Sequence, residues 1–126
     1  MARHNPNALF LLTNPDTHAN IAKVQGEEKM IPGAGCLGAF FKCFLGRDPE
    51  MSPGKPNPAF LSKLLGELEV KAEECLFVGD NLNTDIQLAV NAGTDSLCVL
   101  SGITNEQMLQ DQPAVVPTYY SSHLFV

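Results

Sequence analysis

Residues 76–85, LFVGDNLNTD, form an apolar run that stops at one carboxylate and reaches a second carboxylate five residues later. The apolar run predicts a buried strand, and Asp80 follows its carboxyl end, the edge at which open parallel sheets bind ligands. Gly79 allows the backbone to turn sharply there. We expect Thr84 to cap the next helix and Asp85 to lie in its first turn, where the helix dipole favours a negative charge.

Two interpretations of this aspartate pair are open from the residues alone. Asp80 is a common turn residue and Asp85 a common helix-start residue, so neither requires a function. The pair together favours a function, because two carboxylates at one sheet edge repel each other and are best tolerated when they share a cation. Mg²⁺ takes hard oxygen ligands and keeps several waters, so the stretch predicts a magnesium site.

The second half of the chain alternates between helical and strand patterns. Asn57 and Pro58 are typical of a helix start, and the apolar residues that follow form one helix face. The later predicted elements are a strand at 75–78, a helix at 84–92 ended by Gly93, a strand at 96–100, a short helix begun by a capping box at Thr104 and Gln107, and an edge strand at 115–120. This alternation predicts the α/β class, with a parallel sheet and helices on both of its faces.

The first half of the chain has a different pattern. Residues 8–12 predict a buried strand closed by a turn, and residues 19–32 a solvated loop or hairpin. A helix is expected from about residue 33 until Gly46, with Phe40, Phe41 and Phe44 as core residues at helical spacing. Residues 46–58 contain four prolines and two glycines and mark the clearest boundary in the chain.

Composition excludes several classes of function. The chain has 126 residues, a length typical of one domain, and a net charge of −6 with no cluster of basic residues, which argues against nucleic acid as a partner. No stretch approaches the ~18 apolar residues of a membrane span. No cleavage site follows the apolar residues near the N-terminus, so no signal peptide is expected. The four cysteines lie in apolar runs without a C-x-x-C motif, which predicts buried, reduced thiols and a cytoplasmic protein.

Five stretches together resemble one family, the haloacid-dehalogenase-like (HAD) phosphatases. Residues 79–85, GDNLNTD, resemble the family's G-D-x-x-x-T-D element. The chain is most similar to the branch with p-nitrophenylphosphatases, phosphoglycolate and pyridoxal phosphatases and NagD-type nucleotide phosphatases. The other matching stretches are TNPDTH at 13–18, PGAG at 32–35, GKP at 54–56 and LSGI at 100–103, in the family's order. The resemblance implies a Rossmann-like core domain at 47–126, preceded at 1–46 by the end of a cap domain.

The resemblance also implies a chemistry, the hydrolysis of small phosphorylated metabolites through an aspartyl-phosphate. Asp80 would be a direct Mg²⁺ ligand, Asp85 would orient waters or the lysine, and Lys55 would lie beside the transferred phosphoryl group. The alternative for Lys55 is a solvated lysine in a proline-rich loop. Asn14, Asp16 and His18 would contact substrate; their alternative is an ordinary Asx turn with an exposed histidine.

The family's nucleophile motif, D-x-D, is absent from these residues. The aspartates stand at 16, 48, 80, 85, 95 and 111, and no two of them are separated by a single residue. Residues 48–53, with two prolines and two carboxylates, also make a poor central strand before the lysine. We therefore expect the chain to be the truncated, C-terminal half of a phosphatase that turns over little or no substrate alone. Its exposed sheet edge is expected to pair with a second copy, as a homo-oligomer, or with a complementing chain.

The residues leave two alternatives to the phosphatase interpretation. A non-catalytic pseudo-phosphatase, used for binding or oligomerisation, is the alternative that the missing D-x-D favours. A nucleotide-binding α/β domain is disfavoured because neither G-x-G-x-x-G nor P-loop spacing occurs.

Overall fold

The computed structural model describes residues 5, 7–24, 27–111 and 113–124. Its contacts divide the chain into two compact units, Met1–Gly54 and Lys55–Val126. The division lies inside the proline-rich segment 46–58, eight residues after the boundary expected between cap and core; the assignment of the two parts to cap and core stays a prediction. Among the described residues, no helix combines the length and apolarity needed to cross a membrane.

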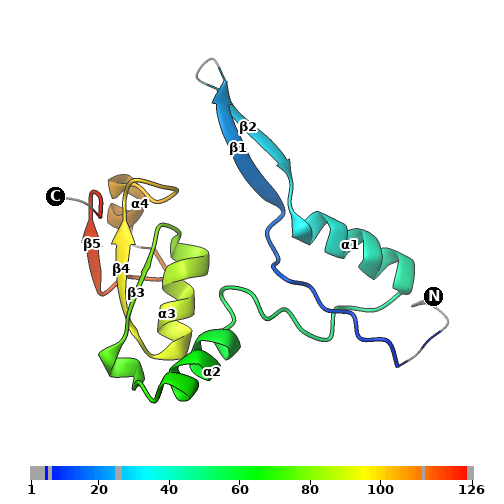
Figure 1. The fold of residues 1–126 in the computed structure, drawn as a ribbon. Coiled ribbons are helices and arrows are strands. Elements are labelled where there is room, and N and C mark those ends of the chain that lie inside the picture. The colour runs from blue at the N-terminus through cyan, green and yellow to red at the C-terminus, as the bar shows by residue number, and fades with distance from the viewer. Residues whose placement is uncertain (1–4, 6, 25–26, 112, 125–126) are drawn as a thin grey trace. The chain divides into compact units, whose positions relative to one another are not determined.

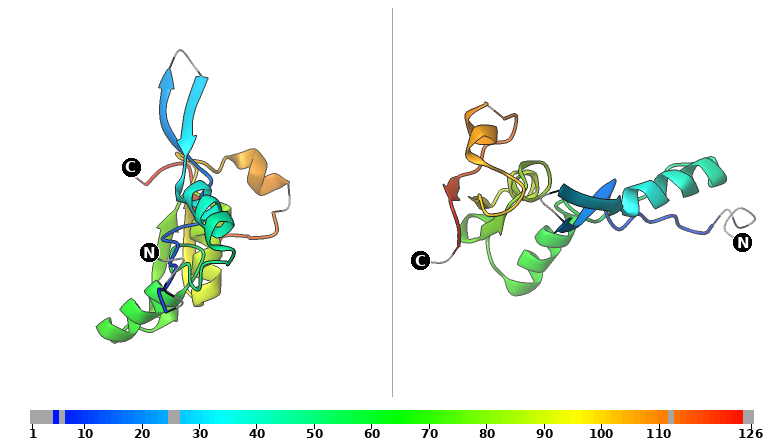
Figure 2. Two further views of the ribbon diagram at one scale, coloured as in Figure 1. Left: turned by 90° about the vertical axis from the view of Figure 1, so that its right-hand side faces the viewer. Right: turned by 90° about the horizontal axis from the view of Figure 1, so that it is seen from above.

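The first unit contains a β-hairpin followed by a helix (Figure 1). Strands β1, His18–Val24, and β2, Glu27–Pro32, pair antiparallel and form the twisted ribbon that Figure 2 shows from two further directions. This confirms the hairpin as the correct alternative for residues 19–32. Helix α1, Ala34–Leu45, ends as predicted at Gly46, whose φ of 69° is left-handed and whose N–H donates to the Lys42 carbonyl.

Two predictions about the first unit's core are wrong. Residues 8–12 form one isolated parallel bridge, between Leu11 and Met51, and the side chain of Leu9 is 74% exposed. Phe40, predicted as core, is 63% exposed, and the other two phenylalanines of α1 are also exposed. The physical reason is that one helix and a two-stranded ribbon bury little apolar surface, so the helix pattern is present without a layer to cover it. Edge-on ring contacts of Phe41 with Phe10 and Phe40 bury only part of this surface.

The second unit is an α/β layer with a three-stranded parallel sheet (Figure 1). The sheet order is β3-β4-β5, with the register Phe77 opposite Ser96 and Cys98 opposite Tyr120. Its elements are α2 Ala59–Leu68, β3 Leu76–Gly79, α3 Gln87–Ala92, β4 Asp95–Val99, α4 Glu106–Gln110 and β5 Tyr119–Ser121, with a 3₁₀ turn at Ala72–Glu74 and a π-helical turn at Leu82–Ile86. The α/β class, the parallel sheet and the edge position of the last strand are confirmed.

The buried side chains of this unit gather on one face of the sheet. Phe77 packs against Leu61 and Leu65 of α2, and Leu88 of α3 belongs to the same cluster. Cys98 lies on the same face in a second cluster. That cluster also contains Leu82 and Ile86, with Leu109 of α4 packed against it. Helices α2, α3 and α4 thus all contribute side chains to, or pack against, these two clusters.

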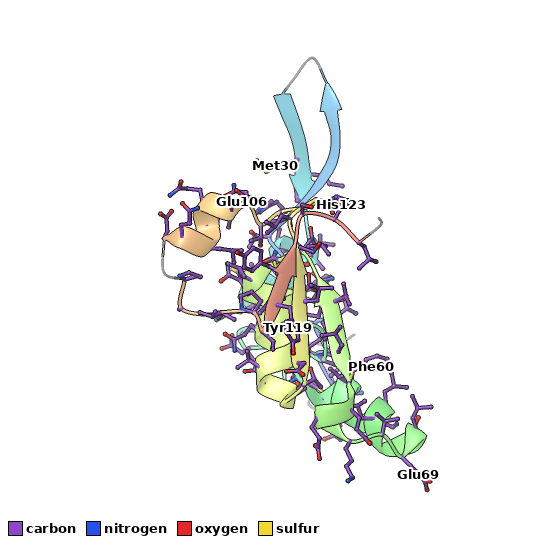
Figure 3. The ribbon with its side chains drawn as sticks, turned by 90° about the vertical axis from the view of Figure 1, so that its left-hand side faces the viewer. Met30, Phe60, Glu69, Glu106, Tyr119 and His123 are labelled. Carbon is purple, nitrogen blue, oxygen red and sulfur yellow. The ribbon has the colours of Figure 1, made fainter. Side chains whose placement is uncertain are left out.

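Side chains that point to the opposite face stay largely open to solvent. Leu76 and Val78 of β3 are 49% and 42% exposed, and Tyr119 of β5 is exposed as well (Figure 3). Alternation along the strands places these three side chains opposite the helices. In α2 the predicted apolar face is only half buried, because Phe60 and Leu68 are exposed. Figure 3 shows Phe60 near the start of α2 and Glu69 at its end.

Asparagine side chains cap two helical segments of this unit. Asn57 was expected to cap α2 with Pro58 as its first residue, but α2 begins at Ala59 with Pro58 as its N-cap, and Asn57 Oδ1 accepts the N–H of Ala59 at 2.9 Å from one residue before the cap. Thr84 was predicted as the next cap, but Asn81 caps the π-helical turn three residues earlier. The capping box predicted at Thr104 is also wrong, since Asn105 accepts the N–H of Met108 and Thr104 is fully buried.

The four cysteines are free, but not all of them are buried as predicted. Cys98 is buried and Cys75 half-buried, whereas Cys36 and Cys43 on α1 are exposed. Burial raises the pKa of the Cys98 thiol, the nearby Thr104 hydroxyl opposes this rise, and the carboxylates of Asp80 and Asp85 add to it. Cys98 is therefore a neutral core thiol.

Candidate functional site

Lys55, Asp80 and Asp85 lie together at the carboxyl end of β3 in the second unit. Asp80 directly follows β3, and Asp85 is in the π-helical turn that comes next. Lys55 Nζ lies 2.6 Å from Asp85 Oδ1, although 30 residues separate the two in the chain. Lys55 is therefore ion-paired although half of its side chain is exposed, and its role in catalysis stays a prediction.

The Asp85 carboxylate is the most enclosed charge of this cluster. Its side chain is 6% exposed, and its Oδ2 accepts the backbone N–H groups of Asp80 and Asn81, both at 3.1 Å. Gly79 makes room for it, because a Cβ on Gly79 would lie 2.3 Å from the Asp85 Cβ. One oxygen of Asp85 is thus bound by the backbone, and the other is bound by Lys55.

The Asp80 carboxylate is held from the opposite side. Its Oδ2 accepts the N–H of Ile103 at 2.9 Å, and its backbone carbonyl accepts the N–H of Thr104 at 2.9 Å. A Cβ on Gly102 would lie 1.9 Å from Asp80 Oδ2, so only glycine leaves space for the carboxylate. Within the described part of the chain, Oδ1 of Asp80 has no hydrogen-bond or ion-pair partner.

Of the two carboxylates in the site, Asp80 is the one whose charge is available to a hard cation. Two carboxylates and one ammonium leave a net charge of −1, and the 52% exposed side chain of Lys55 neutralises Asp85 through a pair that solvent partly screens. Asp80 keeps one oxygen available to a cation. Over the residues that the structure describes, no group of three or more His, Cys, Asp or Glu side chains forms a metal centre. A cation here would take one protein oxygen, with its other ligands from water or from a bound molecule.

The first unit contains the other three predicted site residues, Asn14, Asp16 and His18. Asn14 Oδ1 accepts the N–H of Asp16 at 3.1 Å, and this contact forms the Asx turn that is the alternative to a substrate-binding role. The His18 ring nitrogen Nδ1 lies 3.2 Å from the Thr17 hydroxyl, and His18 is exposed. The turn leaves the side chains of Asp16 and His18 open to a ligand.

Three glycines pack against the backbone of this turn. Added Cβ atoms would lie 2.3 Å from the Asp16 carbonyl at Gly33, 2.3 Å from the Pro15 carbonyl at Gly35 and 2.2 Å from the Thr13 carbonyl at Gly54. Hydrogen bonds join the same segments, from Gly33 N–H to the Thr17 carbonyl and from Gly35 N–H to the Asp16 carbonyl. The glycines of the PGAG and GKP stretches therefore position the turn.

Sequence reasoning missed Gly102 and the Ile103 amide as parts of the site. The LSGI stretch at 100–103 is the signal in the sequence that could have indicated this contact. The contact joins residues 23 positions apart through a backbone N–H, and neither property leaves a pattern of residue types.

Comparisons with known proteins show a family for this chain. The HAD-hydrolase-like family model matches residues 52–124. The chain is 36% identical over 121 residues to phosphoglycolate phosphatase 2 of Arabidopsis thaliana, which covers 95% of this chain and 38% of that protein. It is 35% identical over 106 residues to the ribonucleotide monophosphatase NagD of Escherichia coli, covering 84% and 39%. The chain therefore spans about two fifths of the length of these relatives.

Solved structures give the same result. A glycerol phosphate phosphatase from Mycobacterium tuberculosis in complex with magnesium matches with a TM-score of 0.78 at 31% identity, covering 91% of this chain and 33% of that one. A 4-nitrophenylphosphatase from Thermotoga maritima matches with a TM-score of 0.76 at 29% identity, covering 92% and 42%.

We predict that Asp85→Asn destabilises the second unit. The substitution removes the charge that Lys55 and two backbone N–H groups bind, which costs on the order of 1–3 kcal/mol of the free energy of unfolding. Urea unfolding followed by circular dichroism measures this, with Asp95→Asn as control, because Asp95 is exposed at the start of β4. Equal stability of the two variants would contradict the structural role of the Asp85 carboxylate.

Proposed function

Because this chain belongs to the HAD-hydrolase-like family, as its sequence resemblance predicted, we propose that it supplies one side of a phosphate-monoester hydrolase site that uses a divalent cation. The observation that supports this most is the Asp80 carboxylate just after β3, which is held through one oxygen and whose backbone N–H donates to the carboxylate that binds Lys55. The proposed substrates are small phosphorylated metabolites, the class to which the substrates named for the relatives belong.

Asp80 is the residue proposed to hold the cation. Its free oxygen is a hard donor, and Mg²⁺ is the proposed ion because it is satisfied by few carboxylates and keeps its waters. Structures of the mycobacterial relative in complex with magnesium and with calcium support a divalent cation in general. When bound, such an ion neutralises negative charge on the phosphoryl group.

Lys55 is proposed to bind a phosphoryl oxygen. Its ammonium group has three donors, of which Asp85 occupies one, and half of its side chain is open to solvent. Asp85 acts as a positioning residue, because its buried carboxylate holds the ammonium near the strand end. In the first unit, Asn14, Asp16 and His18 are proposed as substrate-binding residues, as the family resemblance implies.

The nucleophile is the part of this chemistry that these residues do not supply. An aspartyl-phosphate requires an aspartate beside the phosphoryl group, and no D-x-D occurs in the sequence. We therefore propose that this chain by itself turns over little or no substrate. The second candidate, a non-catalytic module that binds phosphorylated ligands, is favoured by the same missing motif.

The exposed sheet surfaces are proposed to take a protein partner, either a second copy of this chain or a complementing chain. Among the described residues, β3 pairs only with β4, so the backbone of its other edge is unpaired, and Leu76 and Val78 are exposed on one face. The free cysteines are compatible with a cytoplasmic location, which stays a proposal.

The proposed anion site predicts Mg²⁺-dependent binding of orthophosphate. Calorimetric titrations in millimolar magnesium chloride measure this binding. We expect Lys55→Met and Asp80→Asn each to weaken phosphate binding about tenfold or more, because each variant loses one charge-assisted contact. Lys63→Met is the matched control, since Lys63 is an exposed lysine of α2 that pairs only with Glu67 among the described residues. Equal binding by all variants would exclude this site.

Hydrolysis of p-nitrophenyl phosphate tests the missing nucleophile. With Mg²⁺ present, we expect the purified chain to release no more p-nitrophenol than its Asp80→Asn variant does. The Thermotoga maritima 4-nitrophenylphosphatase is a suitable positive control. Turnover that Asp80→Asn abolishes would show that the chain is a complete enzyme, with a nucleophile outside the D-x-D pattern.

Self-association follows from the open sheet edge. We expect sedimentation velocity at micromolar concentration to show dimers or larger species, because burial of an apolar sheet face gains roughly 25 cal/mol per Å². Val78→Lys places a charge on the exposed face and should shift the population toward monomer. A monodisperse monomer of the unsubstituted chain would count against this proposal.

A further inference from the structure

The loop after β4 approaches Asp80 closely and holds only one of its carboxylate oxygens. Ile103 N–H donates to Oδ2 at 2.9 Å, and no described residue binds Oδ1. The loop is attached on both sides of this contact. Leu100 N–H donates to the Ser121 carbonyl of β5 at 2.9 Å, and Thr104 N–H donates to the Asp80 carbonyl at 2.9 Å. The Ile103 amide is therefore a fixed donor.

Gly102 is required by space and not by backbone conformation. Among the described residues, the glycines with a left-handed φ are Gly46 and Gly93, so the backbone at Gly102 is one that other residues adopt. A Cβ at this position would nevertheless lie 1.9 Å from Asp80 Oδ2, 2.5 Å from its Cγ and 2.6 Å from its Cβ. Any side chain at residue 102 would displace the carboxylate from the Ile103 amide.

We propose that Gly102 and the Ile103 amide are a positioning element that presents Asp80 to the cation through Oδ1 alone, and that this favours Mg²⁺ over Ca²⁺. A hydrogen bond from the Ile103 N–H to Oδ2 competes with cation binding by that oxygen and so favours monodentate coordination through Oδ1. Mg²⁺ prefers near-octahedral coordination with monodentate carboxylates and retained waters, whereas Ca²⁺ takes more ligands and gains from bidentate carboxylates. The inference deepens the proposed function and rests on Asp80 as the cation ligand.

Mn²⁺ is a direct probe of this site in the full chain. Free Mn²⁺ is measured by its electron paramagnetic resonance signal, and Mg²⁺ and Ca²⁺ compete with it for the bound sites. The variants are Asp80→Asn, Gly102→Ala and the control Gly66→Ala, since a Cβ on Gly66 of α2 meets nothing within 4 Å.

We expect the unsubstituted chain and Gly66→Ala to bind Mn²⁺ equally, with Mg²⁺ a several-fold better competitor than Ca²⁺. Gly102→Ala should lower the affinity about tenfold and remove the preference for Mg²⁺, and Asp80→Asn should abolish binding. If Asp80→Asn binds as well as the unsubstituted chain, the cation role in the proposed function is wrong. If binding depends on Asp80 but Gly102→Ala leaves both affinity and preference unchanged, only the present inference is wrong.

A second measurement does not depend on the folding of the Gly102→Ala variant. In the unsubstituted chain, the Ile103 amide proton should keep its hydrogen-bonded chemical shift and its protection from exchange when Mg²⁺ saturates the site, because Oδ2 stays bound to it. Loss of that protection on Mg²⁺ binding would show that both oxygens turn to the ion and would overturn the proposal.

Discussion

The buried carboxylate of Asp85 is the interaction on which the second unit's site depends. It binds the N–H groups of the two residues after β3 with one oxygen and Lys55 with the other. An ionised carboxylate that is almost fully enclosed is costly unless each oxygen has a charge-matched or hydrogen-bonded partner. The two partners come from the strand end and from the loop before α2, so satisfying Asp85 fixes both segments. Asp80 and Lys55 are positioned as a consequence.

Glycines act in this molecule mainly by leaving space. Gly79 admits the side chain of Asp85, and Gly102 admits that of Asp80. In the first unit, Gly33, Gly35 and Gly54 admit the carbonyl groups of the turn that begins at Thr13. The glycines of four of the matching stretches therefore have one physical reason, the close approach of a neighbouring group to the backbone.

Both units expose large apolar side chains that the described residues do not cover. Helix α1 has an amphipathic pattern but exposes its phenylalanines, and the sheet exposes the face formed by Leu76, Val78 and Tyr119. Such contiguous apolar surface on a small unit is typical of an interface.

The sequence by itself determined much of the local structure and indicated the family. Helix α1 ends at Gly46, α2 begins directly after Pro58, and Asp80 follows a parallel strand, because helix ends, periodicity and strand ends depend on neighbouring residues. Only the tertiary structure decided which polar groups meet and which apolar faces are covered. The Asp80–Ile103 and Lys55–Asp85 contacts join distant segments, and the exposure of Phe40 depends on the absence of a covering layer among the described residues. Burial is a property of the neighbours that the fold supplies, and a pattern of residue types cannot state whether those neighbours are present.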